Sequence, residues 1–366
     1  MPKPKQTRPR TGEAVSAKPE SKTNSPARAK GNEQERRILR EKAICEYVGK
    51  LQHGEADDTY TGRKERTFTR EKAAIAHYIV EQLPELGSTL FFDAGSTLRM
   101  IARATFMRAK EKHLNLIITT NNMDISEDFL SRDKPYSQDP LSGAVSLQLT
   151  GGKYDPQHRA LFGRLAAGTL DNIYPEIVII GLTGFTFEEG LFFHGATEED
   201  VVKAALYSKE TNYRILAFDH SKFGSRDLYP CVPALTRMKE GLCISNGVKE
   251  KTLIVTSEPP DEGSWIPPDD MSEDDRQKAR QQIRKKRQEF NEAWRQLREL
   301  AEKESGDNPK AENHKKGLGD AINEGELEVI AVALDLADAG SAGGSGEDPL
   351  HARVVRKICA QQNASM

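Results

Sequence analysis

The stretch from Leu90 to Thr97, Leu-Phe-Phe-Asp-Ala-Gly-Ser-Thr, constrains the fold of this 366-residue chain more than any other. Its apolar residues end at Asp93, and apolar residues recur at helical spacing directly after Thr97. This order predicts a buried strand, a tight turn at Gly95 and the start of a helix, whose free N–H groups can hold an anion. Asp93 would then lie in the crevice where open α/β sheets bind ligands. An ordinary capped joint between a strand and a helix has the same pattern, so this stretch alone leaves both interpretations open.

Strands and helices are expected to alternate along the chain on both sides of this stretch. Helical spacing of apolar residues predicts helices at 32–51, 69–83, 161–170 and 196–207, and further helices from Thr97 and from about Met123. Apolar runs predict strands at 114–120, 145–150, 176–181, 214–218, 242–245 and 252–256. This alternation implies the α/β class, with a parallel sheet covered by helices. Polar residues follow several of the strands and are expected at one edge of the sheet: Asp93, Thr120, Asn121 and Asp219.

The two ends of the chain differ in composition from this central part. Residues 1–32 are rich in Lys, Arg, Pro and Ser, so we expect a disordered basic tail that contacts nucleic acid weakly and non-specifically through phosphates. Residues 33–66 are expected to form one helix and a polar loop, and residues 258–272 an acidic, proline-containing linker. Residues 273–366 are expected to be a helical extension, with helices at 275–304, 322–336 and 352–359 and a flexible Gly/Ser run at 340–345.

The long charged helix expected at 275–304 carries an apolar residue at every seventh position. Ile283, Phe290 and Leu297 have this spacing, while Lys286 interrupts the offset position. The interrupted repeat favours a helix that packs on the domain. The alternative is a coiled coil, which would join copies of the chain into a homo-oligomer.

The composition argues against several other classes of protein. The net charge of −3 gives no overall nucleic-acid or membrane signature, and no apolar run approaches the roughly 20 residues that span a bilayer. The N-terminus lacks the apolar core of a signal peptide, and the four cysteines show no CxxC spacing. We therefore expect a cytoplasmic protein with no membrane partner, no bound metal and no cofactor.

Four motifs, taken in order, resemble the C-terminal sensor domain of the DeoR family of bacterial transcriptional regulators. Asp93-Ala94-Gly95-Ser96-Thr97 is similar to the family's DAGST turn, and Thr120-Asn121 to its Thr-Asn at a strand end. Thr150-Gly151-Gly152, followed by Gly163, is similar to its TGG motif. The most specific match is Asp219-His220-Ser221-Lys222-Phe223-Gly224, which is similar to the D-x-SKFG signature. The resemblance covers an expected domain at residues 67–257.

The resemblance implies a regulatory sensor of a phosphorylated sugar or related metabolite, on the fold of ribose-5-phosphate isomerase and CoA transferases. The Gly-Ser-Thr turn and Lys222 are suited to a phosphate, although Lys222 beside Phe223-Gly224 also fits a structural role. Asp93, Asn121 and Asp219 are suited to sugar hydroxyls. No catalytic residue is implied. The implied ligand-binding residues are Asp93, Gly95, Ser96, Thr97, Thr120, Asn121, Gly151, Gly152, Asp219, Ser221 and Lys222.

Two departures from the family's pattern affect the function. Residues 33–66 offer no second and third helix for the winged helix-turn-helix that usually precedes the sensor, so any DNA affinity is expected to lie in residues 1–40 and to be sequence-tolerant and salt-sensitive. Thr183 replaces the acid of the family's Gly-Ala-Asp-Gly, which argues against an isomerase. Two alternatives stay open. One is an interaction scaffold, and the other is a sugar-phosphate isomerase or hydrolase with one of these as general base: Asp93, Glu198, Glu199, Asp219 or His220.

Overall fold

The computed structural model describes most of the central part of the chain and three segments of the C-terminal extension. The described residues are 42–52, 63–64, 67–86, 88–132, 134–137, 145–186, 190–193, 202, 205–206, 211–227, 229–230, 244–245, 248–249, 251–260, 271–303, 327–336 and 350–358. The expected basic tail, the Gly/Ser run, most of the helix expected at 196–207 and most of the linker lie outside these residues.

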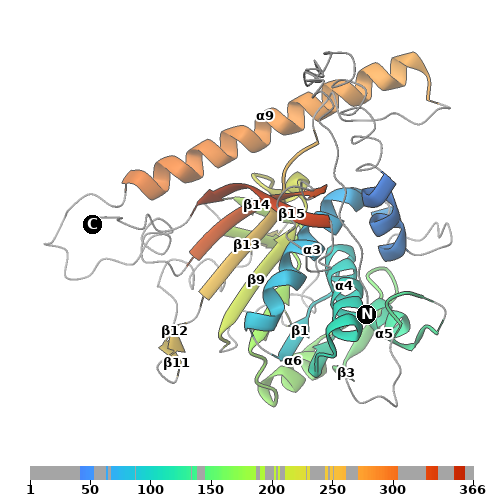
Figure 1. Ribbon diagram of the computed structural model, residues 1–366. Helices are drawn as coiled ribbons and strands as arrows, with labels where there is room; N and C mark the ends of the chain where they lie inside the picture. Colours follow the sequence, from blue (N-terminus) through green and yellow to red (C-terminus); the bar gives the residue numbers. More distant parts are fainter. Residues whose placement is uncertain are drawn as a thin grey trace, which may run out of the picture. The chain divides into compact units, whose positions relative to one another are not determined.

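An eight-stranded sheet forms the centre of the described structure, with the strand order β15-β14-β13-β9-β6-β1-β2-β3 (Figure 1). Every neighbouring pair is parallel except β14 and β15, which are antiparallel. The α/β class with a mostly parallel sheet is therefore confirmed. The strands are β1 (Thr89–Phe92), β2 (Leu116–Thr120), β3 (Val145–Leu149), β6 (Ile177–Ile180), β9 (Tyr213–Phe218), β13 (Lys251–Ser257), β14 (Leu327–Leu336) and β15 (Leu350–Ile358).

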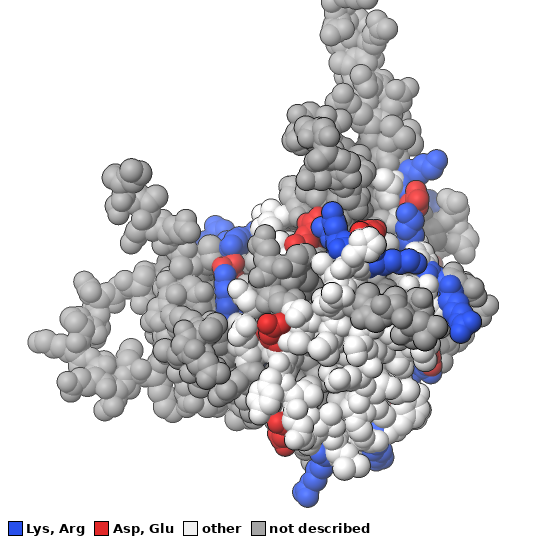
Figure 2. All heavy atoms as spheres, turned by 60° about the horizontal axis from the view of Figure 1, so that its bottom comes forward, with Lys and Arg blue, Asp and Glu red and all other residues white. Residues whose placement is uncertain are grey.

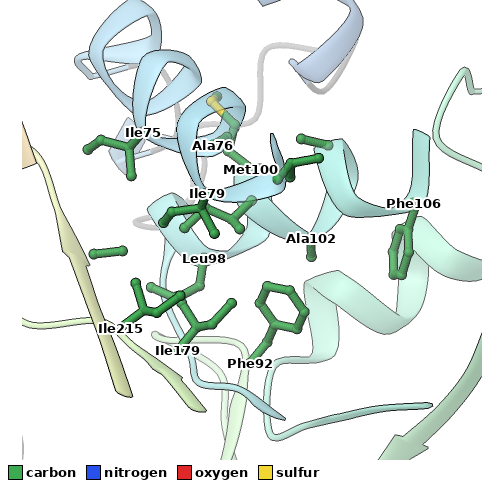
Figure 3. Close-up of a cluster of buried hydrophobic side chains, with 14 of the residues drawn as sticks. Ile75, Ala76, Ile79, Phe92, Leu98, Met100, Ala102, Phe106, Ile179 and Ile215 are labelled. Atoms are coloured by element: carbon green, nitrogen blue, oxygen red, sulfur yellow. The ribbon is translucent and has the colours of Figure 1, made fainter. Parts of the chain in front are cut away.

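Helices cover both faces of this sheet, which is why its strands are apolar on both sides. In β1, Leu90 and Phe92 belong to one apolar cluster and Phe91 to the other. The first cluster includes residues of α3 (Thr69–Leu86), α4 (Ser96–Lys112) and α5 (Met123–Leu130), and Figure 3 shows side chains of α3 and α4 meeting those of the strands. The second cluster includes residues of α6 (Arg164–Asp171) and α9 (Glu273–Lys303).

The long helix α9 packs on its own domain. Phe290, Trp294 and Leu297 are buried in the second apolar cluster, whereas most of the residues before Phe290 are exposed. Figure 1 shows α9 running across the sheet near β14 and β15. The expectation of a packed helix is thus confirmed, and Phe290 and Leu297 of the seven-residue repeat make their contacts within the chain.

The prediction of helices at 322–336 and 352–359 in the C-terminal extension is wrong. Residues 327–336 and 350–358 form the strands β14 and β15. Leu, Glu and Ala in Leu-Glu-Val-Ile-Ala-Val-Ala-Leu suggested a helix. However, Val329 and Ala331 face one apolar cluster, while Ile330 and Val332 face the other. This two-residue alternation is that of a strand buried on both faces, and β-branched residues suit it.

The helix expected at 161–170 begins three residues later than predicted. Ala160–Phe162 is strand β5, which pairs with β4 (Lys153–Asp155) in a hairpin. Gly163 has a φ of 89° and separates β5 from α6. A second small sheet joins β7 (Gly184–Thr186), β8 (Gly190–Phe193) and β10 (Tyr229–Pro230), and a third joins β11 (Ile244–Ser245) and β12 (Val248–Lys249).

The helix expected before the sensor domain is present at residues 42–51. Its residues Ile44, Val48 and Leu51 are buried in the first apolar cluster, so it packs on the same side of the sheet as α3 and α4. Within the described part of the chain, no helix has the length and apolar character needed to cross a membrane. On the face seen in Figure 2, Lys and Arg side chains gather along one border of a broad area of uncharged residues.

Candidate functional site

Polar residues follow three neighbouring strands at the carboxyl edge of the sheet. The strand register pairs Phe92 with Thr120 and Thr120 with Leu149, so the residues that follow them, Asp93, Asn121 and Thr150, lie in one row. All three are buried. These polar residues lie at one edge of the sheet, as expected from the sequence. Open α/β sheets in general bind their ligands at this edge.

A cavity of about 390 Å³ opens beside this row, a volume within the range of small-molecule sites. Five of the residues predicted for the ligand line it, namely Gly95, Ser96, Thr97, Asp219 and Lys222. The other six do not line it: Asp93, Thr120, Asn121, Gly151, Gly152 and Ser221. The remaining polar residues of the wall lie outside the four motifs of the sequence analysis: Arg63, Lys64, Thr67, Lys72, Arg99, Asn122, Asp124, His158 and Thr183.

The first turn of α4 supplies one side of the cavity. Gly95 is its N-cap, with a φ of 136°, and it offers no side chain to the free N–H groups of the helix. Ser96 Oγ accepts a hydrogen bond from Lys72 Nζ at 3.1 Å. Lys72 is 2% exposed and also donates to the carbonyl of Lys64. The Lys72 ammonium group is therefore held beside the N-terminus of α4. The charge of this group and the free N–H groups of the helix both favour an anion at this place.

The turn after β9 supplies a second cation. Asp219 caps the short helix η1 (His220–Lys222) by accepting from the backbone N–H of Ser221 at 3.1 Å and from the Ser221 hydroxyl. Ser221 therefore holds the turn. Burial lowers the pKa of Lys222, the Asp219 carboxylate opposes that effect, and Lys64 adds to it. Burial raises the pKa of Asp219, but the charge of Lys222, the Ser221 hydrogen bond and Lys72 outweigh it and hold that pKa below its usual range.

A buried ion network forms the wall at α4 and α5. Arg99 donates to both Asp128 oxygens, at 2.7 and 2.8 Å, and Arg103 donates to the same carboxylate at 2.7 Å. Arg103 also donates to the carbonyl oxygen of Leu51, at the end of helix 42–51. Arg99 Nη1 lies 3.6 Å from Asp124, which lines the cavity. The spacing of two arginines and two aspartates, each pair four residues apart on a helix, could have revealed this network from the sequence.

The connection between β4 and β5 covers the end of β2. The backbone N–H of Leu161 donates to the backbone carbonyl oxygen of Asn121 at 2.8 Å, and the N–H of Met123 donates to the carbonyl oxygen of Arg159 at 2.9 Å. Arg159 forms ion pairs with Asp124 and Glu127 of α5. Under this cover, both polar atoms of the Asn121 side chain and the Thr150 hydroxyl have no hydrogen-bond partner among the described residues. Such buried groups are uncommon and call for water or a ligand.

Two of the predicted residues have structural roles. The Thr120 hydroxyl donates to the carbonyl of Phe92 at 2.7 Å and accepts from the N–H of Asn122 at 3.0 Å, so it joins two strand ends. Gly152 has a φ of 132°, and a Cβ at this position would lie 2.6 Å from the carbonyl oxygen of Phe162. Gly152 is therefore required by close packing against β5.

His220 is buried in the Lys222 turn. Its Nδ1 lies 3.2 Å from Ser257 Oγ, and the Phe68 ring packs edge-on with its centroid 4.7 Å away. Burial lowers the pKa of His220 from 6.5 to about 4; the Asp219 carboxylate opposes this effect, and Lys286 and Lys222 reinforce it. The imidazole is consequently neutral in the folded protein at neutral pH.

The stability of the protein should therefore fall as the pH decreases from 6.5 towards 4. In this window the unfolded chain binds a proton at His220 and the folded chain does not, so the stability present above pH 6.5 is progressively lost. We expect a loss on the order of 2 kcal/mol. This is less than burial alone would cause, because the Asp219 carboxylate favours the protonated imidazole. Urea denaturation at several pH values will measure it. In His220→Gln this part of the pH dependence should disappear; an identical slope in both proteins would contradict the assignment.

The fold and the site together define an α/β domain with a cavity at the carboxyl edge of a parallel sheet. Residues 67–236 match the family model described as the DeoR C terminal sensor domain. The signature turn from Asp219 to Gly224 and the DAGST turn both lie within the matched residues and both line the cavity.

Curated relatives of the chain include two transcription factors. The HTH-type transcriptional repressor GlcR of Bacillus subtilis is 28% identical over 174 residues, which cover 47% of this chain and 58% of the repressor. The HTH-type transcriptional regulator GolR of Listeria innocua is 28% identical over 171 residues, covering 46% of this chain and 60% of the regulator. The chain thus matches about three fifths of the length of these relatives.

A solved structure also overlaps with part of the fold. Ribose 5-phosphate isomerase A from Methanocaldococcus jannaschii has a TM-score of 0.28 and 16% identity, over 41% of this chain and 52% of the isomerase. This likeness is too slight to add to the strand order given above.

Proposed function

We propose that the protein is a regulatory sensor that binds a phosphorylated sugar or related metabolite in the cavity at the carboxyl edge of its sheet. The observation that carries this proposal is the set of cations around the open first turn of α4. Lys64, Lys72 and Lys222 line the cavity together with Arg63 and Arg99, so its cations outnumber the carboxylates of Asp124 and Asp219. A phosphate dianion complements such a set of charges, and free N–H groups of a helix add to it.

The other side of the cavity suits the hydroxyl groups of a sugar. Asn122, Asp124 and His158 line it and together offer donors and acceptors. The side-chain polar atoms of Asn121 and Thr150 have no hydrogen-bond partner among the described residues and lie on the strand ends next to Asn122, although they do not line the cavity. A water that bridges them to a ligand in the cavity would satisfy them. The arrangement therefore favours a polyhydroxylated phosphate over inorganic phosphate alone.

A regulatory role is supported by the relatives, whose names describe them as a transcriptional repressor and a transcriptional regulator. Contact with nucleic acid belongs to the same proposal. Residues 1–40 carry the basic tail, whose Lys and Arg side chains can neutralise phosphates in a sequence-tolerant way. Assembly into a homo-oligomer is likewise proposed, since most soluble oligomers are homo-oligomers and dimers are the commonest of them.

Lys222→Ala is expected to weaken the binding of a phosphorylated sugar about 10- to 100-fold, because a charge-assisted hydrogen bond contributes about 1.5–3 kcal/mol. Thermal-shift screening of pentose and hexose phosphates would find a ligand, and isothermal titration would measure its affinity. The matched control is Lys110→Ala, which removes an exposed lysine in the last turn of α4. If no phosphorylated compound binds the intact protein, the sensor proposal is wrong. If one binds with the same affinity to Lys222→Ala, the site assignment is wrong.

A further inference from the structure

Helix α9 lies outside residues 67–236, yet it packs directly on the turn that carries Lys222. The turn ends at Gly224, which has a φ of 72°, and a Cβ placed on Gly224 would lie 2.9 Å from the Cβ of Ala293 in α9. The backbone of the turn therefore lies directly against the methyl group of Ala293. A residue other than glycine would push them apart.

An aromatic cluster joins α9 to the same turn. The Phe223 ring centroid lies 4.9 Å from that of Phe290 and 5.4 Å from that of Trp294, and the latter two rings lie 5.7 Å apart. All three side chains are buried. Aromatic rings at these separations interact by about 0.5–1.5 kcal/mol beyond the area that they bury. Phe223 is thus held on the side of α9.

The helix itself is tied to the sheet, so it can act as a fixed support. The Arg356 guanidinium of β15 lies 5.3 Å from the Phe290 ring centroid and 5.9 Å from that of Trp294. It donates to both carboxylate oxygens of Glu258, at 2.9 and 2.6 Å, and to Asn291 of α9 at 2.7 Å. Stacking and bidentate pairing together restrict where α9 can lie.

We propose that Phe290 and Trp294 are positioning residues of the ligand site, because they hold Phe223 and thereby fix the place at which Lys222 presents its ammonium group. The inference rests on the proposed function. Under this proposal the affinity for a phosphate depends on α9, which lies outside the residues 67–236 that match the family model. Lys286 of α9 also acts on this turn, because its charge lowers the pKa of both Lys222 and His220.

Trp294→Ala is expected to weaken the binding of inorganic phosphate to the full-length protein about tenfold, while Trp294→Phe keeps the affinity within about twofold. The matched control is Leu297→Ala. Leu297 is fully buried on the same face of α9, and its loss should destabilise the protein without releasing the rings around Phe223. Titration of phosphate, with a melting temperature for each variant, makes the comparison. Equal losses of affinity in Trp294→Ala and Leu297→Ala would overturn the proposal.

A second measurement needs no ligand and separates this proposal from the proposed function. The titration of Lys222 can be followed by NMR after reductive methylation of the lysines with a ¹³C label, with its signal assigned through Lys222→Arg. In the intact protein burial holds this pKa below its ordinary value. Trp294→Ala should raise it towards that value, because the turn relaxes into solvent, and Leu297→Ala should leave it unchanged. An unchanged pKa in Trp294→Ala would refute the positioning role. A failure of the intact protein to bind both phosphate and every sugar phosphate would instead count against the sensor function, and the NMR result would still decide the role of α9.

Discussion

Asp128→Ala is expected to lower the free energy of unfolding by about 3–5 kcal/mol, because it leaves two buried arginines without their shared carboxylate. Arg99 and Arg103 are 5% and 0% exposed, and both donate to Asp128, which is itself 2% exposed. Burial alone would raise the pKa of Asp128, but the hydrogen bonds and charges of the two arginines hold it below its ordinary value. Urea denaturation at pH 7, followed by circular dichroism, will give the difference.

The neighbouring residue provides the control for this experiment. Glu127 lies on the same helix, its side chain is 55% exposed, and it forms an ion pair with Arg159. Removing an exposed partner of this kind costs about 0–1 kcal/mol, so Glu127→Ala should be close to the intact protein in stability. If Asp128→Ala were equally mild, the arginines would have to find water or another anion, and the buried network would not be needed for folding.

Gly152→Ala is expected to cost about 3 kcal/mol of stability, because it combines backbone strain with a steric clash. Gly152 has a φ of 132°, and a Cβ there would lie 2.6 Å from the carbonyl oxygen of Phe162 and 3.0 Å from the Cβ of Ala166. The backbone of β5 cannot move away without disturbing the hairpin over Asn121. The measurement is the midpoint of urea denaturation, compared at equal m-value.

Gly151→Ala is the matched variant at the adjacent position. A Cβ on Gly151 would lie 3.9 Å from that of Leu165, an ordinary contact. We therefore expect a change within about 1 kcal/mol. A similar loss in both variants would mean that the whole Thr150–Gly152 segment is intolerant for a reason other than the approach of β5.

The central sheet could be predicted from the sequence because its strands are short apolar runs that end in polar or glycine residues. β6, with four buried apolar residues in succession, is the clearest of them. β14 escaped prediction because ten residues of mixed helix- and strand-forming types fit either structure. The pairing of β14 with β13 makes this segment a strand, and that contact joins segments far apart in the chain.

The site could be predicted in part for a similar reason. Gly95, Lys222 and Asp219 stand in short motifs at strand ends, where topology alone brings them together. Lys72 and Arg99 lie within helices and reach the cavity only because α3 and α4 pack side by side on one face of the sheet. No local pattern distinguishes Lys72 from the exposed lysines of the chain. The Asn121 amide has no hydrogen-bond partner among the described residues, and its burial depends on the β4–β5 hairpin. That hairpin was not predicted, because the end of β5 was assigned to a helix beginning at Leu161.

The carboxylate that Arg99 and Arg103 share has a consequence for communication along the chain. Arg99 faces the cavity, while Arg103 holds the carbonyl of Leu51, the last turn of the helix at 42–51. A ligand that drew Arg99 away from Asp128 would change the electrostatic balance at the end of this helix. Thermodynamic linkage would make the relation mutual: if the ligand altered the equilibrium between two arrangements of the helix at 42–51 by some factor, the choice of arrangement would alter the ligand's affinity by the same factor.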